Sequence, residues 1–195
     1  MRKIGITGGI GSGKSLICHL FALNGIPVYS ADDAAKNLMQ HHEPLKKELI
    51  FNFGNIYNEQ GELLRNVLAE KVFSNPVELQ KVNSIVHPFV IADYNNWEES
   101  QKSPYIIRES AILFESGTNK GLDSVITVIA PIELRILRTM IRDHRSREQI
   151  LSIIEKQTSD EFKIAKSDYT IVNDDKQAVL PQVWKLHSIF VNGKQ

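Results

Sequence analysis

Short apolar runs alternate along the chain with longer stretches in which apolar residues recur at helical spacing. Residues 3–7 are apolar and rich in isoleucine, which is typical of a buried strand. The run at 16–23 is long enough for a helix, and Asn24-Gly25 marks its end. Similar strand-like runs follow at 25–29, 104–109, 125–130 and 169–173. This alternation indicates an α/β protein.

Residues 31–103 show little strand character and are predicted to be almost wholly helical. Pairs of turn-forming residues punctuate this region at Gly54-Asn55, Gln60-Gly61, Asn75-Pro76 and His87-Pro88. A crossover between two parallel strands needs only about a dozen residues besides its helix. The excess length therefore implies an inserted helical subdomain, which is a natural place to recognise an acceptor substrate.

The helix expected after residue 131 carries four arginines on one face, at Arg135, Arg138, Arg142 and Arg145. The opposite face is apolar and consists of Ile136, Leu137, Met140 and Ile141. A charged stripe is commonly just a solvated face. This stripe contains no lysine, however, and the arginine side chain can bind phosphate oxygens with two donors at once. We therefore favour an arginine-bearing lid, with a plain surface helix as the alternative.

Two further helices are predicted after the arginine stripe. Ser146 and Gln149 have the spacing of a capping box, so that residues 138–157 would form a helical hairpin. A C-terminal helix over 177–191 is expected to pack its apolar residues on the core, namely Val179, Leu180, Val183, Trp184, Leu186 and Ile189.

Composition and charge narrow the class of protein. The chain has 195 residues, of which 42% are hydrophobic and 24% charged, so it can bury a core. This length suits one compact domain with insertions, or a core that carries small subdomains. Acidic and basic residues are equal at 23 each, and nothing global favours nucleic acid or an anionic membrane. No apolar run approaches the roughly 20 residues of a membrane span, and no signal-peptide pattern is present, so a cytoplasmic location is expected.

The single cysteine, Cys18, falls in the first predicted helix and cannot form an internal disulfide. We interpret it as a small buried apolar side chain, with a reactive thiol as the alternative.

The first strand and the first helix are joined by a sequence that matches the phosphate-binding loop G-x-x-x-x-G-K-[ST], at residues 8–15. Glycines are needed because such a loop turns successive N–H groups inward, which requires positive φ angles. The following helix directs its N-terminal N–H groups at the same anion. Lys14 can then reach the β- and γ-phosphates, and the Ser15 hydroxyl can bind Mg²⁺. The sequence therefore predicts nucleotide binding, rather than an ordinary glycine-rich turn.

Acidic residues stand at the ends of two predicted strands. Asp32 and Asp33 follow the second strand, where α/β sheets bind ligands, but either could instead cap a helix that begins at Ala34. Glu109 ends a later strand and is either close to a metal or a charge facing water. In the helical insertion, Arg65 and His87 are notable polar residues. Each could contact substrate, or be a surface charge and a turn residue respectively.

Taken in chain order, these motifs and several weaker ones resemble the dephospho-CoA kinase family over nearly the full length. The matching segments are 6–15, Ala31-Asp32, Gly61-Glu62-Leu63 with Arg65, His87-Pro88, Leu113-Phe114-Glu115, Arg138 with Arg142, Gln157, and Asp168-Tyr169 with Asn173. The resemblance implies a three-layer α/β/α P-loop NTPase fold with a parallel five-stranded sheet. In that fold, residues 1–30, 104–134 and 158–195 form the nucleotide-binding core, 31–103 the helical acceptor subdomain and 135–157 the lid.

The resemblance also implies a reaction, in which the γ-phosphoryl group of ATP passes to the ribose 3′-hydroxyl of dephospho-CoA in the last step of coenzyme A synthesis. Asp32 would be the base, assisted by Lys14, Arg142 and Arg138. The nucleotide would contact Gly9, Ile10, Gly11, Ser12, Gly13, Lys14, Ser15, Leu16 and Asn173. The acceptor would contact Thr7, Asp32, Arg65, His87, Leu113 and Glu115. Ser15, with Asp32 or Glu109, would bind Mg²⁺. ATP and dephospho-CoA would be the partners of a monomer or weak homo-oligomer, with no nucleic acid or membrane.

Several positions depart from the family pattern, and two other functions compete with the kinase. Ser30, Ala111, Leu64 and Ile153 replace an aspartate, a proline, a polar residue and an arginine respectively. The first rival is another small-molecule or nucleoside monophosphate P-loop kinase. The second is a GTPase-like switch, which is disfavoured because no D-x-x-G follows the loop. A GTPase would also carry an N-K-x-D motif. The nearest match, at residues 119–123, has one residue too many between the lysine and the aspartate.

Overall fold

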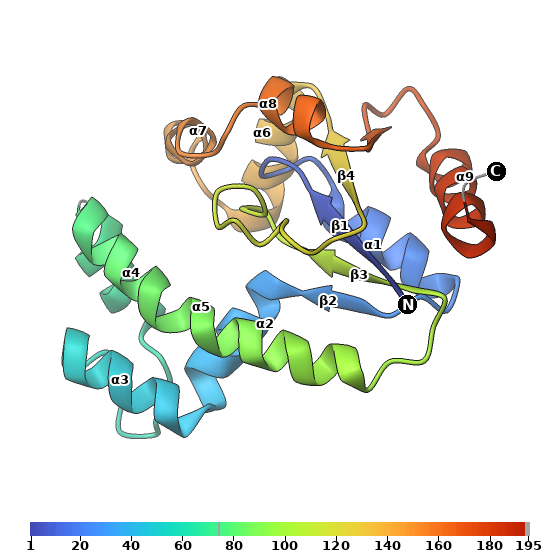
Figure 1. Cartoon of the computed structure of the whole chain (residues 1–195). Coiled ribbons are helices and arrows are strands. Elements are labelled where there is room, and N and C mark those ends of the chain that lie inside the picture. Colours follow the sequence, from blue (N-terminus) through green and yellow to red (C-terminus); the bar gives the residue numbers. More distant parts are fainter. Residues whose placement is uncertain (74, 194–195) are drawn as a thin grey trace. The chain divides into compact units, whose positions relative to one another are not determined.

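Five apolar runs form a parallel β-sheet in the computed structural model of the protein, which describes residues 1–73 and 75–193. The strands are β1 (Arg2–Thr7), β2 (Val28–Ser30), β3 (Tyr105–Glu109), β4 (Ser124–Ile129) and β5 (Tyr169–Val172). Their order across the sheet is β2-β3-β1-β4-β5, and Figure 1 shows β1 between β3 and β4. The predicted α/β class with a five-stranded parallel sheet is confirmed.

The strand order places a ligand position at the carboxyl end of β1. The chain goes from β1 to one side of the sheet through β2, and later to the other side through β4. Open α/β sheets bind ligands where the order reverses in this way, just outside the carboxyl ends of the strands. The register brings Ile6 beside both Glu109 and Ile126, and Ser30 beside Glu109. The ends of β2 and β3 therefore lie near the loop that follows β1.

One face of the sheet is covered by two helices, α1 (Lys14–Leu23) and α9 (Val179–Asn192), which also contact each other. The core between them and the strands contains Ile4, Ile6, Phe21, Ile126 and Phe190, each at most 1% exposed. Burying a side chain of this size stabilises the fold by roughly 1.5–3 kcal/mol. This face therefore fixes where β1 ends and where α1 begins.

The other face is covered by α8 (Asp160–Lys166) and by the loop that follows β3. The hydroxyl of Thr127 on β4 bonds with Ser167 Oγ (2.6 Å) and donates to the carbonyl oxygen of Lys163 (3.3 Å). Leu113 and Leu122 pack over Gly5 of β1, where a Cβ atom would collide with both. The helix α8 was not predicted; Ser159 begins it by accepting a hydrogen bond from the Phe162 N–H.

The predicted helical hairpin is present as α6 (Ile132–Asp143) and α7 (Arg147–Glu155). The Ser146 hydroxyl accepts from the Gln149 N–H, and the Gln149 side chain accepts from the Ser146 N–H. Both bonds satisfy N–H groups that a helix start otherwise leaves unpaired. The capping box is therefore confirmed.

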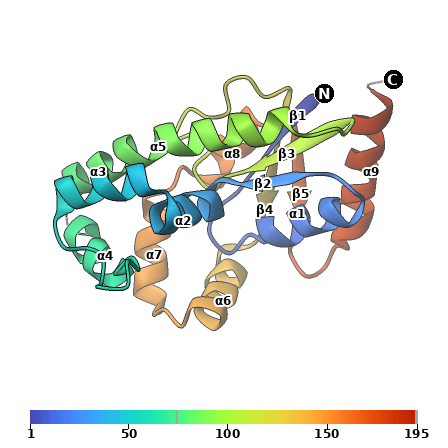
Figure 2. The same ribbon diagram turned by 90° about the horizontal axis from the view of Figure 1, so that it is seen from below.

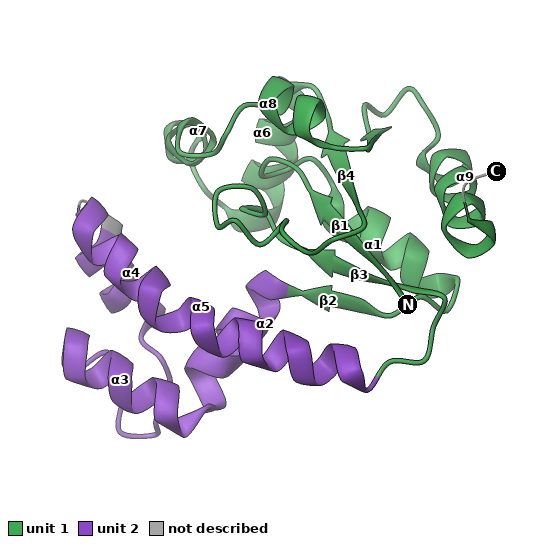
Figure 3. Cartoon of the chain, in the orientation of Figure 1, with its two compact units in different colours: residues 1–30, 101–195 green, residues 31–100 purple. Residues whose placement is uncertain are grey.

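Residues 31–100 form a second compact unit, distinct from the unit made by residues 1–30 and 101–195 (Figure 3). Its helices are α2 (Ala31–His41), α3 (Glu43–Phe53), α4 (Arg65–Phe73) and α5 (Pro76–Glu99). The long α5 contacts each of the other three, and Figure 2 shows α3 and α2 alongside it. Leu45, Leu49 and Ile56 are fully buried inside this unit. The insertion has its own core.

Two local predictions in this unit are wrong. His87-Pro88 does not end a helix, because Pro88 lies inside α5. A proline inside a helix costs about 3 kcal/mol, and burial of Val86 and Val90 on the same helix offsets that cost. Helix α2 begins at Ala31 rather than Ala34, so the two aspartates lie in its first turn instead of capping it. Negative charge is also favourable there because of the helix dipole.

The packed faces of two other helices differ from the prediction. In α6, Arg135 and Thr139 are buried with Ile136, whereas Leu137 and Ile141 are exposed. The buried face is set by hydrogen bonds that the Arg135 guanidinium donates to the Ile10 oxygen and to Asp160, which a count of apolar residues cannot detect. In α9, Leu180 (48% exposed) and Trp184 (60%) do not join the core. Among the described residues, no helix combines the length and apolarity needed to cross a membrane.

Candidate active site

The glycine-rich loop after β1 has the backbone of an anion-binding turn. Gly11 and Gly13 adopt φ angles of 76° and 94°, in the left-handed region that strains any residue with a side chain. Gly13 directly precedes α1, so the positive end of that helix opens onto the loop. Lys14 and Ser15 are the first two residues of α1. The structure thus supplies the strand, loop and helix that the motif requires.

The carbonyl groups of this loop are held by donors from the protein itself. Lys14 Nζ donates to the Gly8 oxygen (3.1 Å), Arg135 Nε to the Ile10 oxygen (2.9 Å) and Asn173 Nδ2 to the Ser12 oxygen (2.9 Å). A carbonyl oxygen that pointed into an anion site would repel the anion. Because these oxygens are bonded to protein donors, the loop keeps the polarity that a phosphate needs.

Close contacts with Arg135 and Asn173 explain why three positions of the loop are glycine. A Cβ atom on Gly9 would collide with the Arg135 guanidinium, and one on Gly13 would collide with the Asn173 amide. Gly11 faces the backbone of Arg135 equally closely. The glycines therefore serve the packing of α6 and of the residue after β5 against the loop, in addition to their φ angles.

Two hydroxyl groups at the start of the site are buried. Thr7 ends β1 and Ser12 lies within the loop, and both residues are 0% exposed. Neither side-chain oxygen has a hydrogen-bond partner among residues 1–73 and 75–193. Buried hydroxyls normally find a partner, so these two are candidates to bond a ligand. Leu16, in contrast, is 47% exposed on the outer side of α1.

The acidic residue at the end of β3 lies near the loop. Glu109 is 7% exposed and accepts a hydrogen bond from Ser30 Oγ (3.1 Å), the residue that departs from the family pattern. Burial raises the pKa of the Cys18 thiol, the Glu109 charge raises it further and the Lys14 charge lowers it. The charges of Glu109 and Lys14 therefore both contribute to the electrostatic potential at the first turns of α1.

Hard oxygen ligands for Mg²⁺ are thus available at this edge of the sheet. The described residues contain no cluster of three His, Cys, Asp or Glu side chains that could hold a metal by themselves. Mg²⁺ needs no such cluster beside a nucleotide, because it is usually bound through one or two carboxylates, phosphate oxygens and water. The Ser15 hydroxyl and the Glu109 carboxylate fit that pattern. Asp32 follows Ser30 by two residues and is exposed in the first turn of α2.

The four arginines of α6 and the turn after it do not act as one stripe. Arg135 is 4% exposed and forms an ion pair with Asp160 (2.8 Å). Arg138 donates to the Asn173 backbone oxygen (3.0 Å) and to the carboxylate of Asp175. Arg142, whose side chain is 60% exposed, forms an ion pair with its neighbour Asp143. The first two arginines thus contact the glycine-rich loop and the residue after β5, and the third faces solvent.

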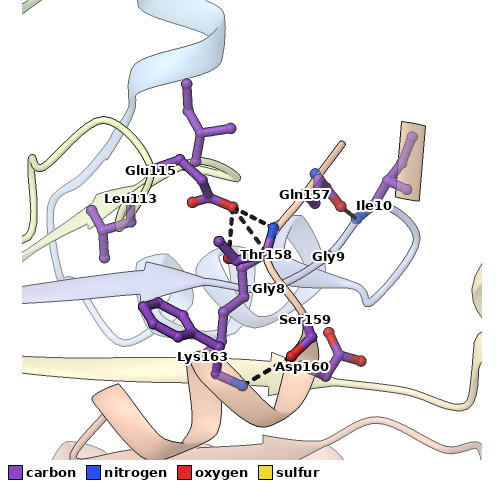
Figure 4. Close-up of polar contacts among 12 residues, drawn as sticks. Gly8, Gly9, Ile10, Leu113, Glu115, Gln157, Thr158, Ser159, Asp160 and Lys163 are labelled. Carbon is purple, nitrogen blue, oxygen red and sulfur yellow. Dashed lines mark hydrogen bonds and ion pairs between the residues drawn. The ribbon is translucent and has the colours of Figure 1, made fainter. Parts of the chain in front are cut away.

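The segment after β3 places two expected acceptor residues in different surroundings. Leu113 is fully buried. Glu115 Oε1 accepts from the N–H (3.0 Å) and the hydroxyl (2.8 Å) of Thr158, and it pairs with the buried Lys163 ammonium at 3.5 Å (Figure 4). Burial acts to raise the pKa of Glu115, but these bonds and the Lys163 charge outweigh it, so the pKa lies below its usual value.

The two remaining acceptor candidates belong to the unit formed by residues 31–100. Arg65 is exposed at the start of α4. His87 is half-buried in α5, and burial lowers the pKa of its imidazole, so the ring is neutral at pH 7. A neutral ring can donate from one nitrogen and accept at the other.

Two contributions to the site were not recognised from the sequence. Arg135 was grouped with the other arginines as a phosphate ligand, yet its side chain bonds the loop backbone. Lys163 is 0% exposed although lysine is rarely buried. Nothing in the local sequence distinguishes either residue from a surface charge. Arg135 pairs with Asp160, which lies on α8, and Lys163 pairs with Glu115, which lies in the segment after β3.

Comparisons with known proteins agree on one family. The family model for dephospho-CoA kinase matches residues 2–178. A dephospho-CoA kinase from Bacteroides fragilis (strain YCH46) is 40% identical over 185 residues, which is 94% of this chain and 90% of that protein. One from Porphyromonas gingivalis is 38% identical over 187 residues, covering 95% and 93% of the two chains.

Solved structures give the same result. A crystal structure of a Thermus thermophilus protein superposes with a TM-score of 0.85 at 31% identity, covering 100% of this chain and 98% of the other. A dephospho-CoA kinase from Campylobacter jejuni superposes with a TM-score of 0.71 at 25% identity, covering 99% of each chain. The similarity therefore extends over the whole chain, including the helical insertion.

Proposed function

The chain belongs to the dephospho-CoA kinase family, and from this we propose that it transfers the γ-phosphoryl group of ATP to the ribose 3′-hydroxyl of dephospho-CoA at the loop formed by residues 8–15. As a kinase of this family it uses ATP. The observation that carries the proposal is the loop itself, whose carbonyl oxygens are bonded to Lys14, Arg135 and Asn173. A loop arranged in this way favours a triphosphate over any neutral ligand.

The reaction has a loose transition state, so that positioning and charge neutralisation lower the barrier more than a strong base does. The acceptor oxygen forms a bond to the γ-phosphorus while the bond to the bridging oxygen of ADP breaks. The proton of the hydroxyl then passes to Asp32, which also orients that hydroxyl. Lys14 neutralises charge on the β- and γ-phosphates, and its first-turn position in α1 supports this role.

Mg²⁺ is the cation proposed for the site, where it would neutralise charge on the β- and γ-phosphate oxygens. The Ser15 hydroxyl would hold it, together with Asp32 or Glu109. The burial of Glu109 at the end of β3 and its hydrogen bond from Ser30 keep that carboxylate in one place. A carboxylate so placed is ready to bind a hard cation without reorganising.

The remaining ligands are proposed on the same basis. Gly9, Ile10, Gly11, Ser12, Gly13 and Leu16 would contact the nucleotide along the loop, and Asn173 would lie beside the adenine. Arg142 and Arg138 would act on the phosphates from α6. Thr7, Arg65, His87, Leu113 and Glu115 would contact the acceptor, with residues 31–103 as its subdomain. A cytoplasmic location and a monomeric or weakly associated state stay predictions of the sequence.

The role of Asp32 is tested by changing Asp32 to Asn. We expect kcat to fall by on the order of 10²- to 10³-fold, because general base assistance and hydroxyl orientation are lost. The KM for ATP should stay within about threefold, since Asp32 makes its main contribution to the acceptor.

The matched control is Asp33→Asn. Asp33 is the next residue of the same helix turn and forms an exposed ion pair with Lys36 (2.7 Å), which contributes little to stability. This variant should keep nearly the parent kcat. An Asp32→Asn variant with the parent kcat would remove Asp32 from the reaction, and equal losses in both variants would show a general effect of charge in this turn.

A further inference from the structure

The residue Ile10, in the middle of the glycine-rich loop, is bonded on both sides by side chains from outside the loop. Its N–H donates to Gln157 Oε1 at 2.9 Å, and its carbonyl oxygen accepts from Arg135 Nε at 2.9 Å. Figure 4 shows the Gln157 side chain directed at Ile10. Gln157 is 147 residues from Ile10 in sequence, in the connection between α7 and α8. The hairpin α6–α7 therefore contacts the loop at both of its ends.

The two side chains fix the orientation of two successive peptide groups. The Gln157 bond holds the Gly9–Ile10 peptide, and the Arg135 bond holds the Ile10–Gly11 peptide. Glycine on each side of Ile10 makes both peptides easy to rotate when they are unbonded. A rotated peptide would bring a carbonyl oxygen toward the phosphate and weaken anion binding. Within the loop, the Gly9 oxygen also accepts from the Ser12 N–H (3.2 Å) and from Lys14 Nζ (3.4 Å). The Gln157 bond holds the N–H side of the same peptide, and the Arg135 bond holds the carbonyl of the next peptide.

Gln157 is itself held in place by the bonds of neighbouring residues in the chain. The next residue, Thr158, donates both its N–H and its hydroxyl to Glu115, and Glu115 pairs with Lys163. On the Arg135 side, the guanidinium pairs with Asp160, which is three residues beyond Gln157. Both ends of the short connection 157–160 are therefore anchored to the unit that carries the loop.

We propose that Gln157 is a positioning residue for phosphoryl transfer, which holds the Ile10 peptide so that the loop keeps its triphosphate-binding form. Gln157 acts through the loop and touches neither reacting atom. The inference rests on the proposed role of residues 8–15 as the triphosphate site.

The test is a change of Gln157 to Met, which keeps the size of the side chain and removes the oxygen acceptor. Leaving a partly buried N–H unpaired should lower kcat/KM for ATP by about tenfold. The KM for dephospho-CoA should change less than twofold, because the acceptor does not bind the Ile10 peptide. Steady-state kinetics with each substrate varied in turn, at saturation of the other, measures both values.

Gln149→Met is the matched control. Gln149 makes the same kind of bond, from its side-chain oxygen to the N–H of Ser146 at 3.0 Å, in the same hairpin but away from the loop. Both variants should lose a few degrees of melting temperature, since each loses one hydrogen bond. Only Gln157→Met should lose kcat/KM for ATP. If both lose it equally, or if Gln157→Met stays within twofold of the parent, the proposal is wrong.

Two further measurements keep the result interpretable. If Gln157→Met does not fold, Thr158→Val is the second variant. It removes one of the bonds that place Gln157 and should lower kcat/KM for ATP about two- to threefold; an unchanged value would overturn the proposal.

Lys14→Ala tests the proposed function separately. Loss of transfer in Lys14→Ala together with a normal Gln157→Met variant would reject the positioning role alone, whereas normal transfer in Lys14→Ala would reject the triphosphate site itself.

Discussion

Single residues in this protein take their roles from neighbours that are distant in sequence, and Glu115 is the clearest case. Its carboxylate is bonded to Thr158 and paired with Lys163, which is fully buried. Without the carboxylate, the buried ammonium group would lose its main counter-charge and keep only the weaker attraction of Asp160. Removing one partner of such a pair is therefore destabilising.

Changing Glu115 to Gln should lower the free energy of unfolding at pH 7 by roughly 1–2 kcal/mol, less than for a fully buried pair because the Glu115 side chain is 21% exposed. The pKa of Glu115 is lowered in the folded protein. Its contribution to stability is therefore fully present above the unfolded value of 4.5 and is lost as pH falls through the lower folded pKa. Urea titrations at pH 7 and near pH 3 measure this change.

The difference between parent and Glu115→Gln should shrink at the lower pH. A difference that is the same at both pH values would show that the charge of Glu115 does not contribute. Equal stability of the two proteins at pH 7 would show that the Lys163 ammonium does not depend on this partner.

The thiol of Cys18 should be nearly inert in the folded protein. Burial raises its pKa, as does the Glu109 charge, and the Lys14 charge opposes them only in part. Because the thiolate is the reactive form, we expect labelling by a disulfide reagent to be at least about 100-fold slower in buffer than in denaturant. Comparable rates in the two conditions would contradict the burial of this side chain.

At the residue scale, candidate site residues could be recognised from the sequence where they belong to a local motif. Lys14, Ser15 and the glycines of the loop are recognisable because strand, loop and helix are contiguous in sequence. The loop contacts of Arg135, Gln157 and Asn173 could not be predicted, because each depends on tertiary contacts with a loop more than 120 residues away.

At the scale of elements, the hairpin of α6 and α7 combines a fixed part with an exposed part. Arg135 and Arg138 are bonded to the loop after β1 and to Asn173, so the first half of α6 is held against these two segments. Arg142 lies one turn further along and its side chain is 60% exposed. An exposed arginine can bind phosphate without first breaking a buried contact.

Arg142→Ala should slow phosphoryl transfer by on the order of 10³-fold if this arginine stabilises the transition-state charge. The free energy of unfolding should change by less than about 0.5 kcal/mol, since the side chain is largely exposed. Single-turnover kinetics under excess enzyme measures the transfer step directly.

The control for Arg142 is Arg147→Ala, at the start of α7. Arg147 forms an exposed ion pair with Glu133 (2.7 Å), and its loss should leave transfer unchanged. A normal transfer rate in Arg142→Ala would remove it from the chemistry. A similar loss in both variants would point to the charge of the hairpin as a whole.

The elements themselves were largely predictable from periodicity and turn residues. The β-strands were found because each is a short apolar run, and the capping box located the start of α7. The start of α2 and the continuation of α5 through Pro88 were missed, since tertiary packing overrides local preferences at both places. The short helix α8 was missed because its sequence buries a lysine.

At the scale of the whole molecule, the chain combines a parallel sheet with an independent helical insertion. The five parallel strands and the loop after β1 were predicted, whereas the order of the strands across the sheet is known only from the structure. The length of the insertion was also predictable, because a simple crossover is far shorter. Which face of each helix is packed was less predictable, as Trp184 and Arg135 show, because packing depends on polar partners as well as apolar area.

We propose, from the family and the geometry of the site, that residues 8–15 bind ATP and that its γ-phosphoryl group passes to the ribose of dephospho-CoA. The most direct test incubates the protein with ATP, Mg²⁺ and dephospho-CoA and locates the new phosphate by phosphorus NMR and mass spectrometry. We predict a phosphate on the ribose 3′-oxygen with the parent protein, and a fall of at least about 10²-fold in its rate of formation with Lys14→Ala. A phosphate at another position, or equal rates for the two proteins, would contradict the claim.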